Sequence, residues 1–479
     1  MTEESLKYKT KKGLYWTFFD QFAKYGMQFI IGIFMARLLS PSDYGITALP
    51  AVFMAIASML VDSGFSTALV RKKECTEEDL TTAFIYSTTI GLFCYILLYL
   101  TSPLIADFYD TPVLTKLIRI ASLGFFLGPL ITPQNVILQR RLDFKTSARV
   151  SIVNKFTSGI VGIIAAYIGF GLWALVISGL CATIMQLFQT WIAVKWLPKA
   201  KWSKESFRYL WGFGNKLILT NLIGVLYNNI APIFIGKFCG PKDLGIYNRA
   251  KGYADMPSTS IAQVLLKVSF PVLSKLQDDN ELLARQYQKM IRVCTFITFP
   301  LMMMLVALAR PLVLTLITEK WEMCILPLQI LCFSAMLQPI QGINLNLLQV
   351  KGRSDLFLRL EIIKKPICFL IYLISLNWGI LGFCFGTVVV GIVALFFNAY
   401  YSKELINCSL IRQLRDIAHI FILSFIVLLS VFAISSMFNN MIMQIVIGGI
   451  TGLIVYIGGS LLFHFDEIND MKYLLSKKK

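Results

Sequence analysis

The sequence Pro41-Ser42-Asp43-Tyr44-Gly45-Ile46 decides the fold, because it returns as Pro241-Lys242-Asp243-Leu244-Gly245-Ile246. The two copies are 200 residues apart (241 − 41 = 200). A long apolar segment precedes each copy, and another follows it. Pro and Gly interrupt regular structure and Asp is a good helix N-cap, so P-x-D-x-G predicts a tight turn between two helices, capped by the Asp. The same turn between the same pair of segments predicts that the chain contains one helical unit twice.

The composition predicts an all-α polytopic membrane protein. Of the 479 residues, 56% are hydrophobic and only 15% are charged, whereas a soluble protein has roughly 25% charged residues. Apolar runs of about 20 residues recur along the chain and predict about fourteen transmembrane helices, the first over 13–37 and the last over 441–464. The ten Cys are scattered through apolar segments and there are two His, so we expect no disulfide, no metal site, no cofactor and no His-based catalysis.

Lys and Arg gather in every second loop between the predicted spans. Such an asymmetry is typical of cytoplasmic loops, and with an even number of spans it predicts that both termini are cytoplasmic. It also accounts for the net charge of +18. Nucleic-acid binding is the rival explanation of that charge, and we disfavour it because the basic residues sit in short loops between spans.

The repeat predicts the domain organisation. Residues 1–195 form an N-terminal six-helix bundle and residues 209–403 a second, pseudo-symmetric one, and the two are expected to be related by an axis along the membrane normal. The basic segment 196–208 links them and suits an amphipathic helix on the cytoplasmic membrane surface. Residues 404–479 add two further transmembrane helices and a basic tail.

Polar side chains recur every three or four residues in several spans, so that they share one helical face. The predicted span 244–272 has Lys251 and Asp255 where its repeat partner, the predicted span 43–62, has Ala51 and Ala55. Charges at membrane depth are costly and usually face water or one another. We therefore predict a cleft whose substrate-binding residues are Lys24, Gln28, Lys155, Lys216, Asn228, Arg249 and Lys251, with Asp20 and Asp255 as candidates for ion coupling. We assign no catalytic residue.

Two structural explanations compete with this cleft. Asp20 with Lys24, and Lys251 with Asp255, have the i,i+4 spacing of ion pairs that only join helices. Lys155 has the length to extend its ammonium group to the membrane interface. Neither explanation covers Lys216 and Arg249, which have no obvious partner in the sequence. A cleft with an excess of positive charge suits an anionic, hydroxyl-rich substrate, since Lys and Arg bind phosphate and carboxylate groups.

Three further segments carry a family resemblance. The segment from Ala36 to Gly45, ARLLSPSDYG, resembles the first turn of the polysaccharide-flippase branch of the multidrug/oligosaccharidyl-lipid/polysaccharide exporter superfamily. The segments DSGFSTALVR (62–71) and FPVLSKL (270–276) resemble the ends of the second and eighth helices of that family. The resemblance covers essentially the whole chain and implies a V-shaped, MATE-like fold.

The resemblance implies that the protein flips undecaprenyl-pyrophosphate-linked oligosaccharide units across the bacterial inner membrane, for capsule, O-antigen or exopolysaccharide synthesis. The lipid bilayer is then its environment, and the polysaccharide polymerase machinery a further partner. A cation-coupled multidrug exporter of the same fold is the alternative, which the excess of Lys and Arg disfavours. A membrane glycan polymerase or ligase is a third hypothesis, but the outer loops are only about ten residues long.

Overall fold

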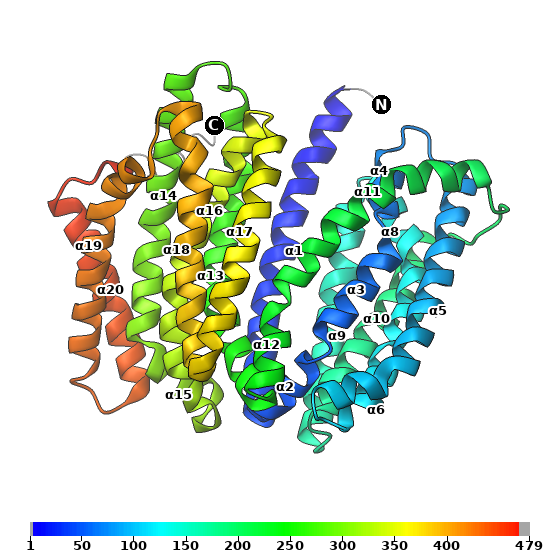
Figure 1. Cartoon of the computed structure of the whole chain (residues 1–479), viewed down its shortest axis with the longest axis horizontal. Coiled ribbons are helices and arrows are strands. Elements are labelled where there is room, and N and C mark those ends of the chain that lie inside the picture. The colour runs from blue at the N-terminus through cyan, green and yellow to red at the C-terminus, as the bar shows by residue number, and fades with distance from the viewer. Residues whose placement is uncertain (1–2, 469–479) are drawn as a thin grey trace. The chain divides into compact units, whose positions relative to one another are not determined.

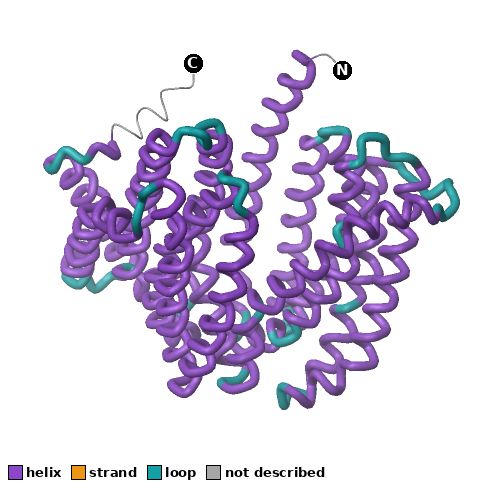
Figure 2. Tube along the Cα trace, turned by 45° about the horizontal axis from the view of Figure 1, so that its top comes forward, coloured by secondary structure: helices purple, strands orange, loops and turns teal. Residues whose placement is uncertain are grey.

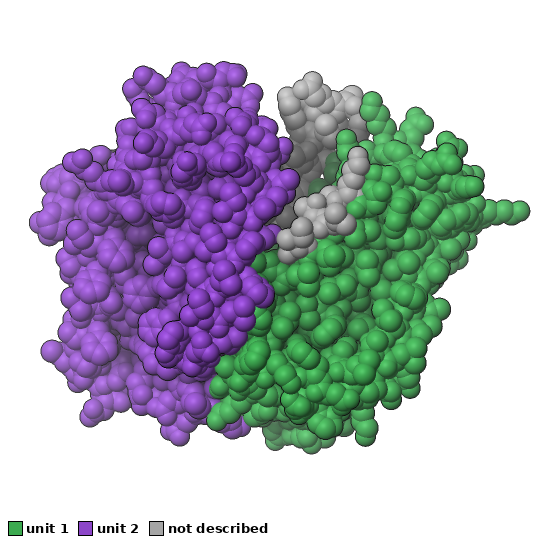
Figure 3. Space-filling view, in the orientation of Figure 1, with its two compact units in different colours: residues 1–245 green, residues 246–479 purple. Residues whose placement is uncertain are grey.

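The computed structural model describes residues 3–468, leaving aside the side chains of residues 3–15, 17–18, 216–217, 219–220, 223, 264 and 267–268. All regular structure in this range is helical, with short loops between the helices (Figure 2). The helices form two compact units, Met1–Gly245 and Ile246–Lys479, which Figure 3 shows in separate colours. The predicted all-α polytopic fold is confirmed.

Unit 1 is organised around helix α9, which packs against α1 on one side and α10 on the other. The last helix to begin in this unit, α13 (Pro241–Ser274), continues into unit 2. Figure 1 labels most of the helices. The remaining elements of unit 1 are α1 (Glu3–Leu38), α2 (Pro41–Ala48), α3 (Ala51–Asp62), α4 (Phe65–Arg71), α5 (Glu77–Phe108), α6 (Val113–Ala121), α7 (Leu123–Leu127), the 3-10 helix η1 (Gly128–Ile131), α8 (Thr132–Arg140), α9 (Phe144–Tyr167), α10 (Trp173–Val194), α11 (Lys204–Asn228) and α12 (Ile230–Phe238).

Unit 2 is a bundle in which α14 packs against both α16 and α19, while α18 packs against α16 and α17. The last helix, α20, lies along α19 (Figure 1). The elements are α14 (Asn280–Ala307), α15 (Ala309–Ile317), the 3-10 helix η2 (Glu319–Cys324), α16 (Ile325–Val350), α17 (Ser354–Ser375), the 3-10 helix η3 (Leu376–Trp378), α18 (Gly379–Ile406), α19 (Leu410–Ser435) and α20 (Met441–Leu462).

A buried hydrogen-bond network joins α19 to the rest of unit 2. Tyr287 Oη on α14 donates to Asn344 Oδ1 on α16 at 2.5 Å, and Asn344 Nδ2 donates to Gln413 Oε1 on α19 at 3.2 Å. Gln413 Nε2 in turn donates to Ser402 Oγ on α18 at 2.9 Å. Buried polar groups are costly without partners, so this network fixes α19 in place. The predicted helices outside the repeat are therefore integral to the unit.

The number of membrane spans stays a prediction. Within the described residues, ten helical segments are long and apolar enough to cross a membrane, or eleven if the bent pair Phe19–Leu38 and Pro41–Ala48 is one span. One of the ten, Ser354–Ile406, contains both α17 and α18. The polar helices α11 and α13 are not among the ten. A count of about fourteen is compatible with this arrangement.

Both copies of the repeated motif lie at the start of a helix, as predicted, but the capping residue differs from the prediction. In the first copy the N-cap is Ser40, whose Oγ accepts from the backbone N–H of Asp43 at 3.2 Å. Asp43 is the third helical residue, and its Oδ2 accepts from the Ser40 backbone N–H at 2.9 Å. This reciprocal arrangement is a capping box, in which the acidic residue lies three positions after the cap. The expectation that Asp43 is itself the N-cap is wrong.

The two motif copies pack against each other through their glycines. A Cβ atom on Gly45 would lie 1.6 Å from the carbonyl oxygen of Pro241, and one on Gly245 would lie 1.9 Å from that of Pro41. Both distances are far shorter than any non-bonded contact. Only glycine therefore permits this close, reciprocal approach of the two helix starts.

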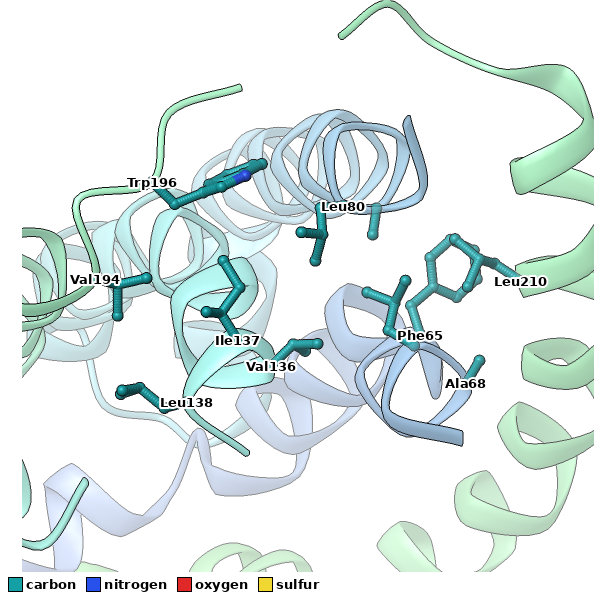
Figure 4. Packing of buried hydrophobic residues seen from close by; sticks show 11 residues of the cluster. Phe65, Ala68, Leu80, Val136, Ile137, Leu138, Val194, Trp196 and Leu210 are labelled. Atoms are coloured by element: carbon teal, nitrogen blue, oxygen red, sulfur yellow. The ribbon is translucent and has the colours of Figure 1, made fainter. Parts of the chain in front are cut away.

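A cluster of buried hydrophobic residues joins α4, α5, α8, α10, the linker after α10 and the first part of α11 (Figure 4). Phe65, at the start of α4, is fully buried and stacks on Tyr86 of α5 with ring centroids 4.3 Å apart. The cluster consists of Phe65, Ala68, Leu69, Leu80, Ala83, Val136, Ile137, Leu138, Val194, Trp196 and Leu210. Through it, α11 packs within unit 1 against α4 and α5.

The linker between α10 and α11 differs from the predicted surface helix. Residues 196–203 form no helix, and the helical part begins at Lys204. The linker is instead held against α5: the Trp196 indole N–H donates to Glu77 Oε2 at 2.8 Å, and the Ser203 backbone N–H donates to Thr82 Oγ1 at 3.1 Å. Pro198, which lacks a backbone donor, disfavours helix in this short segment.

Candidate functional site

A charged pair lies within α1. Lys24 Nζ donates to Asp20 Oδ2 at 2.7 Å, and the two side chains are 35% and 13% exposed. The pair predicted from the i,i+4 spacing is therefore formed. Because each charge has a counter-ion, Lys24 binds a ligand only if it is shared between that ligand and Asp20.

Gln28 and Lys155 lie at the same level of two packed helices. A Cβ on Gly159 of α9 would meet Ile31 of α1 at 2.2 Å, so these two residues mark a contact point between the helices. One turn earlier on each helix are Lys155 and Gln28. Gln28 is exposed and Lys155 is half-buried, and Lys155 forms no ion pair with any described residue. A lysine and an amide residue thus lie at the same level of α1 and α9 in unit 1.

The second charged pair lies on α13 and extends to α16. Lys251 Nζ lies 2.8 Å from Asp255 Oδ2, with side chains 38% and 27% exposed. Gln338 of α16 donates through Nε2 to Asp255 Oδ1 at 2.8 Å. Asp255 thus has one partner on its own helix and one on a neighbour. The predicted pair is formed, while Gln338 was not predicted because its proximity depends on helix packing.

Arg249 lies against two aromatic rings in unit 2. Its guanidinium carbon is 5.2 Å from the ring centroid of Trp321 and 5.6 Å from that of Tyr253. Trp321, from η2, is fully buried. Such cation–π contacts orient the guanidinium group. The sequence gives no signal for Trp321, which lies 72 residues further along the chain (321 − 249 = 72).

A polar groove, which we call the α3–α11 groove, runs between these two helices of unit 1. Its volume is about 480 Å³. The predicted residue Asn228 lines it, and the predicted residue Lys216 lies on the same helix, α11, but its side chain is outside the described residues. The lining residues are Ala55, Ser58, Met59, Asp62, Ser63, Gly64, Ile218, Asn221, Gly224, Val225 and Asn228.

Asp62 and Ser58 are groove residues that the sequence interpretation does not place in the site. Both are exposed, and with Ala55 they have the spacing of one helical face. Asp62 is the last residue of α3. At a helix end an exposed carboxylate is common, so the sequence alone does not mark Asp62 as a groove residue. The signal that identifies it as a groove residue is the presence of Asn221 and Asn228 on the facing helix, which only the tertiary structure provides.

The predicted site residues therefore fall into separate groups in the two units. Unit 1 holds the Asp20–Lys24 pair, the Gln28–Lys155 level and Asn228 in the groove, and unit 2 holds Arg249 and the Lys251–Asp255 pair. Among those with described side chains, four are cationic and two are carboxylates, an excess of two positive charges (4 − 2 = 2). Such a set is suited to binding an anionic group and to hydrogen bonding with hydroxyls.

Comparison with known proteins gives concordant matches. The family described as polysaccharide biosynthesis protein matches residues 34–326, more than half of the chain. The teichuronic acid biosynthesis protein TuaB of Bacillus subtilis is 28% identical over 302 residues, which are 63% of this chain and 62% of TuaB, less than two thirds of its length. The lipopolysaccharide biosynthesis protein WzxC of Escherichia coli is 25% identical over 367 residues, 75% of this chain and 74% of WzxC.

A solved structure shows the same fold over nearly the whole chain. The lipid II flippase MurJ, in an inward closed conformation, matches with a TM-score of 0.75 at 17% sequence identity. The match covers 95% of this chain and 99% of MurJ. At this identity the likeness establishes the fold.

Proposed function

Because the chain belongs to the family of polysaccharide biosynthesis proteins, in the polysaccharide-flippase branch of the multidrug/oligosaccharidyl-lipid/polysaccharide exporter superfamily, we propose that it flips lipid-linked oligosaccharides across the bacterial inner membrane. The cargo is an undecaprenyl-pyrophosphate-linked repeat unit, destined for capsule, O-antigen or exopolysaccharide. Both termini lie on the cytoplasmic side, as the distribution of Lys and Arg predicts. The polymerase that extends the glycan acts on the flipped product.

The excess of cations within the long helices supports this function best. Charges at membrane depth cost a few kcal/mol each on insertion scales, so they are retained where they bind something. Lys155, Arg249 and the two paired lysines are the groups that suit a pyrophosphate. A lipophilic cation, the usual cargo of a drug exporter, is repelled by the same set.

The proposed mechanism is alternating access between the two halves of the chain, which the structure divides into Met1–Gly245 and Ile246–Lys479, with α11 packed in the first. The cationic residues bind the pyrophosphate while the polyprenyl tail stays in the lipid. Movement of one half against the other exposes the bound head group to either side of the membrane. Asp20 and Asp255 couple this movement to an ion gradient by exchanging their lysine partners for the ion.

Charge neutralisation tests this proposal. The double variant Lys216→Gln/Arg249→Gln, made in the full chain, is expected to reduce surface polysaccharide at least tenfold at an unchanged protein level in the membrane. The matched control is Arg285→Gln/Arg310→Gln, which removes two mainly exposed charges, 74% and 64% exposed, from other parts of the chain. Undiminished export by the first variant contradicts the role of these two cations.

A further inference from the structure

Close contacts lie beyond both ends of the α3–α11 groove. At one end Gly214 of α11 touches the turn after α3, where a Cβ would lie 2.3 Å from the carbonyl oxygen of Ser63. At the other end Gly236 of α12 packs on the side chain of Leu49, just before α3, where a Cβ would lie 2.4 Å from Leu49 Cδ2. Between them, a Cβ on Gly224 would meet nothing within 4 Å. The helices therefore separate in the middle, and the space is of the size that binds small ligands, roughly 300–1,000 Å³.

The turn that carries Asp62 is held in a fixed, strained conformation. Ser63 and Gly64 both have left-handed backbone conformations, with φ of 44° and 71°. A left-handed serine is costly and persists where the surroundings impose it. Here Gly214 packs closely against both the Ser63 carbonyl oxygen and the buried ring of Phe65. The Asp62 carboxylate at the edge of the groove is thus presented by a rigid backbone.

The Asp62 carboxylate has unused acceptor capacity. Ser66 Oγ donates to its Oδ1 at 2.6 Å, and its Oδ2 accepts no hydrogen bond from the described residues. An ionised carboxylate has about four lone-pair positions, so it accepts from two neighbouring hydroxyls at once. No described Lys or Arg lines the groove. Its described lining of a carboxylate and amides therefore favours a hydroxyl-bearing ligand.

The facing wall alternates amide and apolar side chains. Asn221 and Asn228 are exposed into the groove at a spacing of seven residues, two helical turns, with Ile218 and Val225 beside them. Each amide offers two donors and an acceptor, and so hydrogen-bonds hydroxyls in either sense. A sugar ring has hydroxyls around its edge and apolar C–H groups on its faces. Asp62 and the amides match the edge, while Ile218 and Val225 match the faces.

From these observations we propose that the α3–α11 groove is the glycan subsite of unit 1, binding a sugar ring of the cargo with Asp62 as the residue that recognises adjacent hydroxyls. This assignment rests on the proposed function and separates two parts of the cargo. The sugar lies against a carboxylate and amides, whereas the pyrophosphate binds the cations, which are not among the described lining residues of the groove.

Filling the groove tests the proposal. Gly224→Leu places a side chain in the open space and raises the helix propensity of α11, so the fold is expected to persist. Gly212→Leu is the matched control, because a Cβ there also meets nothing within 4 Å and the residue does not line the groove. Asp62→Asn removes the carboxylate, and Asp107→Asn, at an exposed position outside the groove, is its control.

The measurement is the dissociation constant of two probes for the purified full chain in detergent, by native mass spectrometry. One probe is undecaprenyl pyrophosphate without a glycan, and the other is lipid-linked oligosaccharide extracted from host membranes depleted of this protein. We expect the unchanged chain and both controls to bind the glycan-bearing lipid at least tenfold more tightly than the bare lipid. Gly224→Leu and Asp62→Asn lose this preference and bind the bare lipid as before.

The other outcomes contradict either the glycan subsite alone or the proposed function as a whole. If Gly224→Leu and Asp62→Asn keep the preference of the unchanged chain, or if the unchanged chain has no preference, the groove is not a glycan subsite and the flippase proposal stands. If the unchanged chain binds neither lipid, the proposed function fails, and the groove assignment fails with it.

Discussion

The helices that follow the two copies of the repeated turn differ more than their sequences suggest. After the first copy the chain forms α2, breaks near Pro50 and resumes as α3, whereas after the second it forms the single helix α13. Ala55 lines an open groove, and its counterpart 200 residues later, Asp255, is paired with a lysine and a glutamine (255 − 55 = 200). One helix therefore provides space and hydrogen-bonding groups, while the other provides charge.

In the proposed function, the groove beside α3 and the charged pair on α13 give the two copies different roles. The turn and the glycine contact are kept in both copies, because they fix where the helices begin. The faces beyond the turn differ, since Ala55 of the first copy corresponds to Asp255 of the second. In the proposed function, the first copy contributes the glycan subsite and the second contributes part of the anion-binding charge.

The largest expected effect comes from breaking the contact that the two copies share. Gly45→Ala and Gly245→Ala each place a methyl group within 2 Å of a proline carbonyl oxygen, at 1.6 and 1.9 Å. Each variant is expected to lower the free energy of unfolding by about 3 kcal/mol, since backbone atoms must move. Reversible unfolding in detergent measures the loss.

The control for this prediction is Gly252→Ala on α13, where the added Cβ meets nothing within 4 Å. It is expected to be neutral or slightly stabilising, because alanine has the higher helix propensity. Equal stabilities of Gly45→Ala and Gly252→Ala would contradict the reciprocal packing of the two turns.

The caps of the two copies are expected to respond in opposite ways to the same side chain. Ser40→Ala removes the hydroxyl of the capping box and is expected to cost about 1 kcal/mol of unfolding free energy. The corresponding residue in the second copy is Gly240, with φ of 91°. Gly240→Ser supplies the missing hydroxyl but strains a left-handed position, so it is expected to destabilise.

Thermal unfolding of Ser40→Ala and Gly240→Ser shows whether a serine cap stabilises both turns or only the first. If Gly240→Ser raises the melting temperature, the second turn accepts the same cap as the first, and the difference between the copies is smaller than the structure indicates.

The ion pair on α13 is expected to contribute modestly to stability. Lys251 and Asp255 are 38% and 27% exposed, so solvent screens their attraction. A double-mutant cycle with Lys251→Ala and Asp255→Ala is expected to give a coupling energy of about 0.5–1 kcal/mol. Coupling well above this range would mean that the pair is mainly a structural tie, and would weaken its assignment to binding.

The smallest expected effect concerns the acidic residues of the two turns. Burial raises the pKa of Asp243, so its ionised form is disfavoured in the folded protein. The stability that this raised pKa provides is fully present below the pKa of the unfolded state, about 3.9. It is lost as the pH rises through the pKa of the folded state. Asp243→Asn removes this loss and is expected to leave stability at neutral pH unchanged or slightly higher.

Asp43→Asn provides the contrast in the first turn. Asp43 accepts from the Ser40 backbone N–H at 2.9 Å and from Ser40 Oγ at 2.7 Å, so weakening these bonds is expected to destabilise the protein. Melting temperatures between pH 4 and pH 8 compare the two variants. If Asp243→Asn lowers the melting temperature more than Asp43→Asn does, the carboxylate that caps its helix is the one in the second turn, which contradicts the assignment.

Local patterns predicted the parts of this molecule that depend on local sequence. The duplicated turn, the helical fold and the two i,i+4 ion pairs follow from spacing along the chain, and the structure has all of them. The cap was predicted wrongly because Ser and Asp both suit that position and only the backbone geometry separates them. The helix expected over 196–208 begins at Lys204, because Trp196 and Ser203 bind to α5 instead.

The parts that depend on helix packing could not be predicted. Asp62 and Ser58 become groove residues only because α11 carries two amides opposite them, and Trp321 reaches Arg249 from a distant 3-10 helix. The roles of Lys24, Gln28, Lys155 and the other assigned cleft residues stay predictions.

The central claim is that this protein moves lipid-linked oligosaccharide from the inner to the outer leaflet. The most direct measurement is the leaflet location of complete repeat units in cells depleted of the protein. The account predicts that they accumulate on the cytoplasmic leaflet while surface polysaccharide disappears. Accumulation of unpolymerised repeat units on the outer leaflet would contradict it, and would place the protein after translocation.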